Sequence, residues 1–287
     1  MVFRTNPTTN NNRTFRRVQV GATNLLSRGA FALNPKWTGR AVHKKFFTPQ
    51  RFYSKPKHQN ILEKANLVTL DYQGRPIKLW SWGQGEKVLM VHGWSGRGAQ
   101  FYALIEALIL VGLQPVTFDQ PAHGDQKGVT NLFEFIEATE FVAQELGGLK
   151  AVVGHSMGTV PSLQLAQKFG LKTVLFAPGM NLRQPIENVA RGFGLHAGIV
   201  KQLLNDLETK HGKSIDDVSP EVILGKITTP VLIMHDEGDK YAPAKASAAV
   251  SANLEHVKYH QTKNLGHSKI LEDPALVQMA LDYILED

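Results

Sequence analysis

Short apolar runs alternate with longer segments of helical periodicity from about residue 66 to the end of the chain. Runs without polar interruption are typical of strands that are covered on both faces. They lie at Val88–Val91, Pro115–Phe118, Ala151–Val153, Thr173–Phe176 and Val231–Met234, and a more mixed run lies at Val257–Tyr259. Ahead of them, Leu67–Tyr72 and Ile77–Trp82 flank Gly74-Arg75-Pro76, which predicts an opening hairpin.

Segments of helical periodicity separate or follow these runs. They are Ala99–Val111, Leu132–Leu146, Thr159–Phe169, Ala244–Ala252 and Ala275–Leu285. Strands that alternate with helices pair mostly in parallel, because each helix returns the chain to the start of the next strand. The pattern therefore predicts an α/β fold, with a mostly parallel sheet and helices on both of its faces.

One interval is longer than a single crossover helix needs. Residues 177–230 separate two predicted strands and contain helical patterns at Gln184–Arg191, Ala197–Lys210 and Pro220–Leu224. Open α/β sheets bind their ligands at the carboxyl ends of the strands. We therefore expect residues 181–226 to form a helical cap over those ends, and residues 61–180 and 227–287 to form the core.

The charge is concentrated at the N-terminus. The chain has 287 residues and a formal net charge of +7, but residues 1–60 hold 12 basic side chains and no acid, which leaves 20 basic and 25 acidic residues in the remainder. The high pI therefore describes a basic extension, and we expect no nucleic-acid binding by the body of the protein. Residues 5–17, rich in Asn, are predicted to be disordered.

The basic extension has three interpretations. Its composition is that of an organellar transit peptide. The mixture of aromatic and cationic residues at Trp37–Phe52 is typical of a helix at a membrane surface. The favoured interpretation is an extension whose aromatic side chains, at Trp37, Phe46, Phe47 and Phe52, pack onto the body.

The overall composition excludes several protein classes. A hydrophobic share of 43% with 20% charged residues is globular and excludes a collagen-like fibre. Since there is no cysteine, a disulfide framework, a thiolate metal site and a cysteine nucleophile are excluded. No apolar run reaches the roughly 18 residues of a membrane-spanning helix. We expect a cytoplasmic protein without stable membrane insertion, and its oligomeric state stays open.

The segment Gly154-His155-Ser156-Met157-Gly158 matches Gly-x-Ser-x-Gly and lies between a predicted buried strand and a helical segment. A serine nucleophile at such a site occupies a tight, strained turn, so the positions two residues before and after it must be small. The pattern alone arises by chance, but its place between strand and helix is the one that the chemistry needs. Ser156 is therefore the candidate nucleophile.

A serine hydroxyl needs a base to remove its proton, and the base must be oriented by a third group. In a sheet of this kind the acid and the histidine follow the serine, on loops after later strands. Asp239 and His267 fit these positions, and Asp236 competes with Asp239 for the role of the acid. His155 is too near Ser156 in the chain to serve as its base.

The oxyanion that forms during attack needs two backbone N–H donors. One is expected from Met157, the residue after the nucleophile, and the other from the loop after the strand Val88–Val91. That loop contains His92-Gly93-Trp94, where Gly93 lets the chain turn inward and expose the Trp94 N–H.

Together these residues resemble the α/β-hydrolase superfamily, over about residues 65–287. The matching landmarks, in chain order, are His92-Gly93, the Asp-x-Pro-x-His-Gly segment Asp119–Gly124, Gly154–Gly158, Asp239 with Pro243 beyond it, and Gly266-His267. The resemblance implies a mostly parallel eight-stranded sheet with a variable cap. Many members have glycine where this chain has Asp236, which is a departure from the family pattern.

A serine nucleophile excludes the members of that superfamily that use aspartate in its place. The resemblance implies a serine carboxylesterase-type hydrolase that cleaves small or medium acyl esters, with Ser156, Asp239 and His267 as a catalytic triad, and with no metal or organic cofactor. Its expected partner is a small-molecule ester. A thioesterase, a carbon–carbon bond hydrolase and a non-catalytic ligand-binding member are the alternatives.

Overall fold

The computed structural model describes residues 44, 46–51, 54–192 and 195–286. The chain divides into two compact units. One unit comprises Thr48–Asn181 and Asp216–Asp287 and contains the sheet, and the other comprises Met1–Phe47 and Leu182–Ile215. Among the described residues, none of the helices combines the length and the apolar character that crossing a membrane requires.

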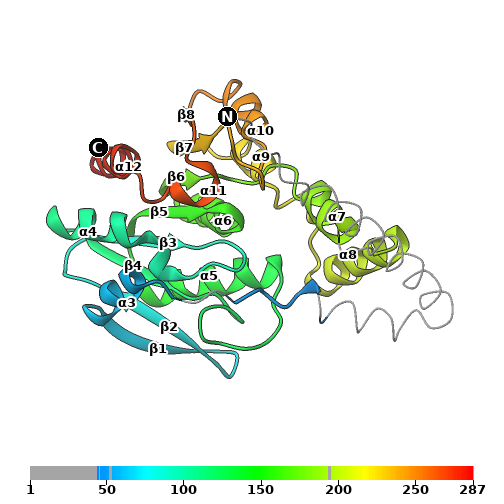
Figure 1. Ribbon diagram of the computed structural model, residues 1–287, viewed down its shortest axis with the longest axis horizontal. Coiled ribbons are helices and arrows are strands. Elements are labelled where there is room, and N and C mark those ends of the chain that lie inside the picture. The colour runs from blue at the N-terminus through cyan, green and yellow to red at the C-terminus, as the bar shows by residue number, and fades with distance from the viewer. Residues whose placement is uncertain (1–43, 45, 52–53, 193–194, 287) are drawn as a thin grey trace, which may run out of the picture. The chain divides into compact units, whose positions relative to one another are not determined.

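The sheet has eight strands in the order β1-β2-β4-β3-β5-β6-β7-β8 (Figure 1). The bounds are β1 Asn66–Tyr72, β2 Arg75–Ser81, β3 Lys87–Val91, β4 Gln114–Phe118, β5 Leu149–His155, β6 Lys172–Phe176, β7 Val231–Asp236 and β8 Val257–Thr262. β2 pairs antiparallel with β1 and with β4, and the other neighbours pair in parallel. The predicted α/β class with a mostly parallel eight-stranded sheet is confirmed.

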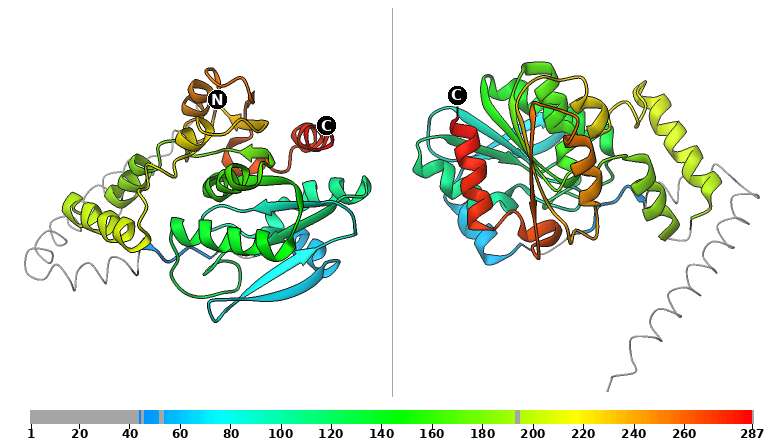
Figure 2. Two further views of the ribbon diagram at one scale, coloured as in Figure 1. Left: turned by 180° about the vertical axis from the view of Figure 1, so that it is seen from behind. Right: turned by 90° about the horizontal axis from the view of Figure 1, so that it is seen from above.

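The two faces of the sheet are covered by different helices, as Figures 1 and 2 show. On one face, Val88 and Met90 of β3 share a buried cluster with side chains of α4 (Tyr102–Leu110) and α12 (Pro274–Leu285). On the other face, Leu89 and Val91 pack with α5 (Leu132–Leu146) and α6 (Thr159–Phe169). Because successive strand residues point to opposite faces, both must be apolar, and this explains the uninterrupted runs in the sequence.

The opening hairpin turns one residue earlier than expected. Tyr72 pairs with Arg75, so the loop is Gln73-Gly74, and both residues have positive φ, 53° and 75°. This is the conformation of a two-residue turn that matches the twist of the strands. Pro76, which was placed in the turn, lies in β2 opposite Asp71. Glutamine rarely adopts positive φ, so the sequence carried a weak signal for this turn.

Several short elements differ from the expected pattern. The predicted helix Ala99–Val111 is a 3-10 turn, η1 (Gly98–Phe101), followed by α4. A helix that was not expected, α3 (Pro56–Glu63), begins inside the basic extension, and Trp82 donates its indole N–H to the Ile61 carbonyl at 3.0 Å. A second unexpected helix, α11 (Gly266–Lys269), contains His267. The remaining core helices are α9 (Pro220–Leu224) and α10 (Ala244–Ser251).

The other unit contains α7 (Arg183–Gly192) and α8 (Ala197–His211). Arg183 pairs with Glu208 at 2.6 Å, and the same carboxylate accepts the Ile215 N–H at 2.9 Å. The buried residues of α8 are Ile199, Val200, Leu203, Leu204 and Leu207. The cap expected over residues 181–226 stays a prediction, because the position of this unit relative to the sheet is not determined.

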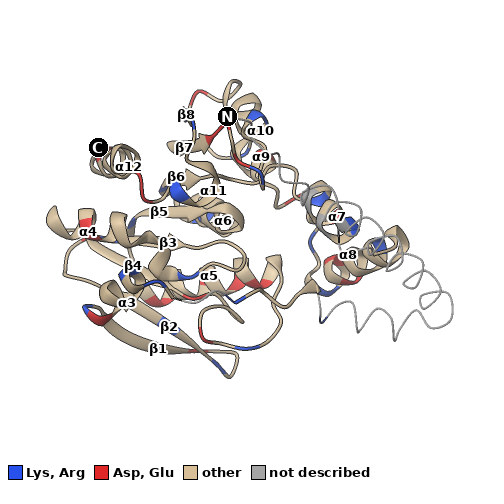
Figure 3. Ribbon diagram, viewed as in Figure 1, with Lys and Arg blue, Asp and Glu red and all other residues tan. Residues whose placement is uncertain are grey.

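Acidic and basic side chains are interspersed along the described elements of the core (Figure 3). The expected disorder at residues 5–17 and the expected packing of Trp37 and Phe52 fall outside the described residues. Phe46 and Phe47 contact each other edge to face, with ring centroids 5.2 Å apart.

Candidate active site

The chain makes a sharp turn where β5 ends and α6 begins, at η2 (Ser156–Gly158). Ser156 has a φ of 54°, a left-handed conformation that costs energy for a residue other than glycine. A Cβ on Gly154 would lie 2.8 Å from the Thr159 Cα, and one on Gly158 would lie 2.2 Å from the Val91 carbonyl oxygen. Backbone fills the space on both sides of the turn, so both positions must be glycine.

The three residues proposed as a triad lie within hydrogen-bonding distance of one another. His267 Nε2 is 2.9 Å from Ser156 Oγ, and His267 Nδ1 is 2.6 Å from Asp239 Oδ2. The Asp239 side chain is fully buried, whereas that of His267 is 14% exposed. The geometry allows a proton to pass from the hydroxyl to an imidazole whose other nitrogen contacts a carboxylate.

Asp239 receives hydrogen bonds on both of its oxygens. Oδ1 accepts the Tyr241 N–H at 2.7 Å and the Ala242 N–H at 3.0 Å. Oδ2 accepts from His267 and, at 3.2 Å, from the buried His235. Burial alone would raise the pKa of Asp239, but the hydrogen bonds from His235, His267 and Ala242 outweigh it and hold the pKa below its usual value. The carboxylate is therefore ionised at neutral pH.

Asp236, the competing candidate for the acid, has other partners. It is fully buried at the end of β7, and its side chain accepts from Thr262, Leu265 and Gly238. The structure thus pairs Asp239 with the imidazole and directs Asp236 toward the neighbouring loop.

The His-Gly loop after β3 runs directly against the turn that carries Ser156. A Cβ on Gly93 would lie 2.7 Å from the Ser156 Cβ and 3.2 Å from the Met157 nitrogen. The expected reason for glycine was freedom to turn inward, but Gly93 is not among the residues with positive φ. The structural reason is the close approach of this loop to the turn that carries Ser156 and Met157. The Trp94 ring stacks on Phe135 with centroids 6.0 Å apart.

Two buried histidines join this loop to the segment Asp119–Gly124. His92 donates from Nδ1 to the Gly93 carbonyl at 2.8 Å and accepts the Gln120 N–H at 2.9 Å. His123 accepts the Ser95 N–H at 2.9 Å. Burial lowers the pKa of His123 to about 4 and that of His92 well below its usual range, so both rings stay neutral. Sequence reasoning named both segments but could not foresee that they support each other.

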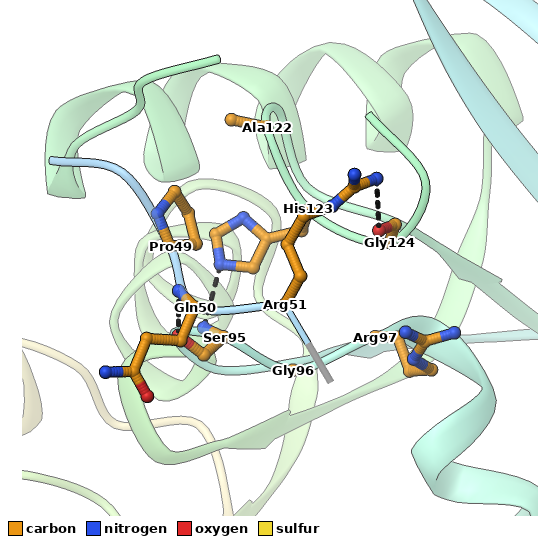
Figure 4. A pocket seen from close by; sticks show the side chains of 9 residues that line it. All are labelled: Pro49, Gln50, Arg51, Ser95, Gly96, Arg97, Ala122, His123 and Gly124. Carbon is orange, nitrogen blue, oxygen red and sulfur yellow. Dashed lines mark hydrogen bonds between the residues drawn. The ribbon is translucent and has the colours of Figure 1, made fainter. Parts of the chain in front are cut away.

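A small hollow beside this loop is lined by residues from the basic extension, as Figure 4 shows. The Gln50 N–H donates to Ser95 Oγ at 2.9 Å, and the Arg51 guanidinium donates to the Gly124 carbonyl at 3.2 Å. These residues lie in a segment that the sequence analysis placed outside the core. Their contacts depend on the tertiary structure, and no local pattern in the sequence signals them.

A metal site is a separate question. The part of the chain that the structure describes contains no group of three or more His, Asp and Glu side chains arranged to hold a metal ion.

Solved structures with the same fold include several hydrolases. The thioesterase domain from the curacin biosynthetic pathway superposes with a TM-score of 0.57 at 18% identity, over 77% of this chain and 99% of that one. Est1E from Butyrivibrio proteoclasticus, solved with ferulic acid, gives 0.58 at 18% identity over 76% and 100%. An esterase from Exiguobacterium antarcticum gives 0.59 at 19% identity over 76% and 99%. At these identities the likeness shows the fold alone.

Sequence comparison gives the family. A curated relative, 2-hydroxy-6-oxo-6-phenylhexa-2,4-dienoate hydrolase from Burkholderia cepacia, is 25% identical over 281 residues, which covers 77% of this chain and 96% of the relative. The model of the alpha/beta hydrolase family matches residues 88–278, a span that includes Ser156, Asp239 and His267. With that match over more than half of its length, the chain belongs to the alpha/beta hydrolase family.

Proposed function

We propose that the protein is a serine hydrolase of the carboxylesterase type, which cleaves small or medium acyl esters through an acyl-enzyme intermediate. The observation that carries this proposal is the continuous line of hydrogen bonds from Ser156 Oγ through His267 to Asp239. The fold shared with two esterases supports it.

In the first step His267 acts as the general base. Its Nε2, 2.9 Å from Ser156 Oγ, takes the hydroxyl proton as the oxygen attacks the ester carbonyl. Asp239 accepts the Nδ1–H, which keeps the ring in the tautomer with a free Nε2 and stabilises the imidazolium that forms. Because the carboxylate is buried and ionised, this stabilisation acts in a region of low dielectric.

The N–H groups of Trp94 and Met157 are proposed to bind the oxyanion of the tetrahedral intermediate. His267 then returns its proton to the leaving alkoxide, and the acyl group remains on Ser156. A water molecule, deprotonated by the same imidazole, attacks the acyl-enzyme, and the imidazolium then gives that proton to Ser156 Oγ as the acid is released. The proposed steps use no metal and no organic cofactor.

The test compares Ser156→Ala with a matched control. Hydrolysis of p-nitrophenyl esters of graded acyl length is measured for the wild type, for Ser156→Ala and for Ser251→Ala, which removes a buried hydroxyl on α10. We expect the first variant to lose roughly 10⁶-fold in kcat and the second to lose little. Full activity in Ser156→Ala would overturn the mechanism. Failure of the wild type to react with a fluorophosphonate probe would favour a non-catalytic ligand-binding protein.

A second candidate is hydrolysis of a carbon–carbon bond. The substrate named in the curated relative carries a ketone and no ester, so its hydrolysis breaks a carbon–carbon bond. The same triad could serve that reaction. A panel of esters, thioesters and vinylogous diketones, compared by kcat/KM, separates this candidate and a thioesterase from the proposed esterase.

A further inference from the structure

The backbone on both sides of His267 is bonded by side chains that the proposed mechanism does not use. One is Asp236, the last residue of β7, which is fully buried. The other is His155, the last residue of β5, which is 6% exposed. Within the described part of the chain, neither side chain forms a hydrogen bond to Ser156 or Asp239, yet both contact the segment that carries the imidazole.

Asp236 connects three segments at the carboxyl ends of β7 and β8. Its Oδ2 accepts the Thr262 hydroxyl at 2.9 Å and the Leu265 N–H at 3.0 Å, and the Gly266 N–H adds a further bond. Its Oδ1 accepts the Gly238 N–H at 2.9 Å. The carboxylate therefore holds the two residues that immediately precede His267.

The main chain of Asp236 also supports the acid. Its carbonyl accepts the Asp239 N–H at 3.1 Å, so one residue fixes both the start of the acid-bearing loop and the end of the histidine-bearing loop. Burial would raise the pKa of Asp236, but the bonds from Leu265 and Gly266 outweigh it and lower the pKa. An ionised carboxylate accepts hydrogen bonds at both oxygens, which matches the donors that surround this one.

His155 holds the other side of His267. Its Nε2 lies 2.8 Å from the His267 carbonyl oxygen, and its Nδ1 lies 3.0 Å from the Gln100 amide nitrogen. Since a carbonyl only accepts, Nε2 carries the proton, and Nδ1 therefore accepts from Gln100. The planes of the two imidazole rings are inclined at 48° to each other, with centroids 4.9 Å apart.

The hydrogen bond from His155 to the His267 carbonyl connects the segment of the proposed base to the turn of the proposed nucleophile. His155 directly precedes Ser156 in the strained turn, so a bond from its ring to the His267 backbone relates the base to the element that carries the hydroxyl. Burial, and then the proximity of His267, lowers the pKa of His155 to about 3. The ring is therefore a neutral donor at neutral pH, so it adds no charge beside the proposed base.

We propose that Asp236 and His155 are positioning residues that hold the backbone on both sides of His267. The inference rests on the proposed function, because it assigns a purpose to the placement of the base. A catalytic group displaced by about 1 Å loses roughly 100-fold in rate. Loss of either anchor is therefore expected to act on kcat, while the site that binds the ester is unchanged.

The Asp236 anchor is tested with three variants and one control. Asp236→Ala removes all side-chain bonds, Asp236→Asn keeps one acceptor oxygen for Thr262 and Leu265, and Thr262→Val removes a single donor. The control is Thr173→Val, which loses a buried hydrogen bond to the Leu171 carbonyl near the start of β6, at the opposite ends of the strands. We expect kcat to fall roughly 100-fold in Asp236→Ala with KM nearly unchanged. Asp236→Asn should keep most of the wild-type kcat.

The His155 anchor is tested with a conservative pair. His155→Gln can place its amide nitrogen near the position of the imidazole Nε2 and still donate to the His267 carbonyl, whereas His155→Leu cannot. We expect His155→Leu to lower kcat and the rate of fluorophosphonate labelling by roughly 10-fold or more, and His155→Gln to recover most of both. The downfield proton NMR signal of the His267–Asp239 hydrogen bond should weaken in His155→Leu and remain in His155→Gln.

The outcomes separate this proposal from the proposed function. If Ser156→Ala is inactive while Asp236→Ala and His155→Leu keep the wild-type kcat, the anchors are refuted and the mechanism stands. A rise in KM without a change in kcat, or a kcat loss equal to that of Thr173→Val at equal loss of stability, also refutes them. If Asp236→Ala does not fold, Thr262→Val is used for the test instead. We then expect kcat to fall in Thr262→Val, and a wild-type kcat would refute the Asp236 anchor. Activity in Ser156→Ala instead refutes the mechanism itself.

Discussion

Replacing Gly93 by alanine adds one methyl group where the loop after β3 lies against the turn that carries Ser156. Gly93 is not among the residues with positive φ, so the backbone there is open to alanine, and packing alone opposes the change. The added Cβ would lie 2.7 Å from the Ser156 Cβ and 2.9 Å from the His155 carbonyl oxygen. The substitution therefore presses the loop that carries Gly93 directly against the turn that carries Ser156.

The size of the effect follows from these distances. Carbon atoms in contact lie about 3.5–4.0 Å apart, so the loop and the turn must separate by nearly 1 Å. Neither contacting atom is the end of a flexible side chain, so the backbone itself must move. A shift of that size, or the loss of one oxyanion donor, costs roughly 10²–10³ in kcat. We expect kcat of Gly93→Ala to fall within that range, with stability lowered by about 1–3 kcal/mol.

The assay measures kcat and KM for a p-nitrophenyl ester, together with thermal unfolding. Gly148→Ala is the matched control, because a Cβ at Gly148 meets nothing within 4 Å and this residue directly precedes β5, at the end of the strand remote from Ser156. The control should match the wild type in both measurements. Wild-type kcat in Gly93→Ala would refute the assignment of this loop to the oxyanion hole.

Two further predictions concern the buried acid at the end of β4 and the basic extension. Burial raises the pKa of Asp119 from its ordinary value of 3.8 to about 6. The hydrogen bond from the Gly98 N–H acts in the opposite direction but is outweighed. The folded state thus retains a proton that the unfolded state releases, so stability falls by about 3 kcal/mol over the whole titration, and by about 2 kcal/mol of this between pH 4 and pH 6. Asp119→Asn should remove this fall, as urea unfolding at pH 4 and pH 7 can show. Deletion of residues 1–34 should leave liposome and DNA association unchanged in co-sedimentation assays, because the extension is interpreted as packing on the body.

The central strands could be predicted from the sequence because that part of the sheet is covered on both faces. Runs such as Val88–Val91 are apolar at every position for that reason, and each predicted run lies inside a strand. The short helices could not be predicted in the same way. α11 has 4 residues, fewer than two turns, and no hydrophobic period develops over that length. α3 was missed because basic residues dominate its surroundings.

The chain order of the three candidate residues could be predicted from the sequence, but the contacts that hold their loops in place could not. Ser156, Asp239 and His267 were expected to meet because each follows a predicted strand and carboxyl ends of parallel strands share one edge. The structure brings them together, and their catalytic roles stay a prediction. The bond from Gln100 to His155 joins segments far apart in the sequence, and so does that from Gln50 to Ser95. Neither pair has a local pattern, because these contacts exist only once the sheet has assembled.

Burial distinguishes His267 from the other histidines at this end of the sheet, which the sequence alone could not do. His92, His123 and His155 are buried, and burial lowers the pKa of each, so none of them takes up a proton at neutral pH. His267 is partly exposed, and its Nδ1 contacts the buried carboxylate of Asp239 at 2.6 Å. The neutral rings then act as fixed donors and acceptors for the loops. The buried rings are therefore suited to a structural role, and His267 keeps the exposure and the carboxylate contact that the proposed base requires.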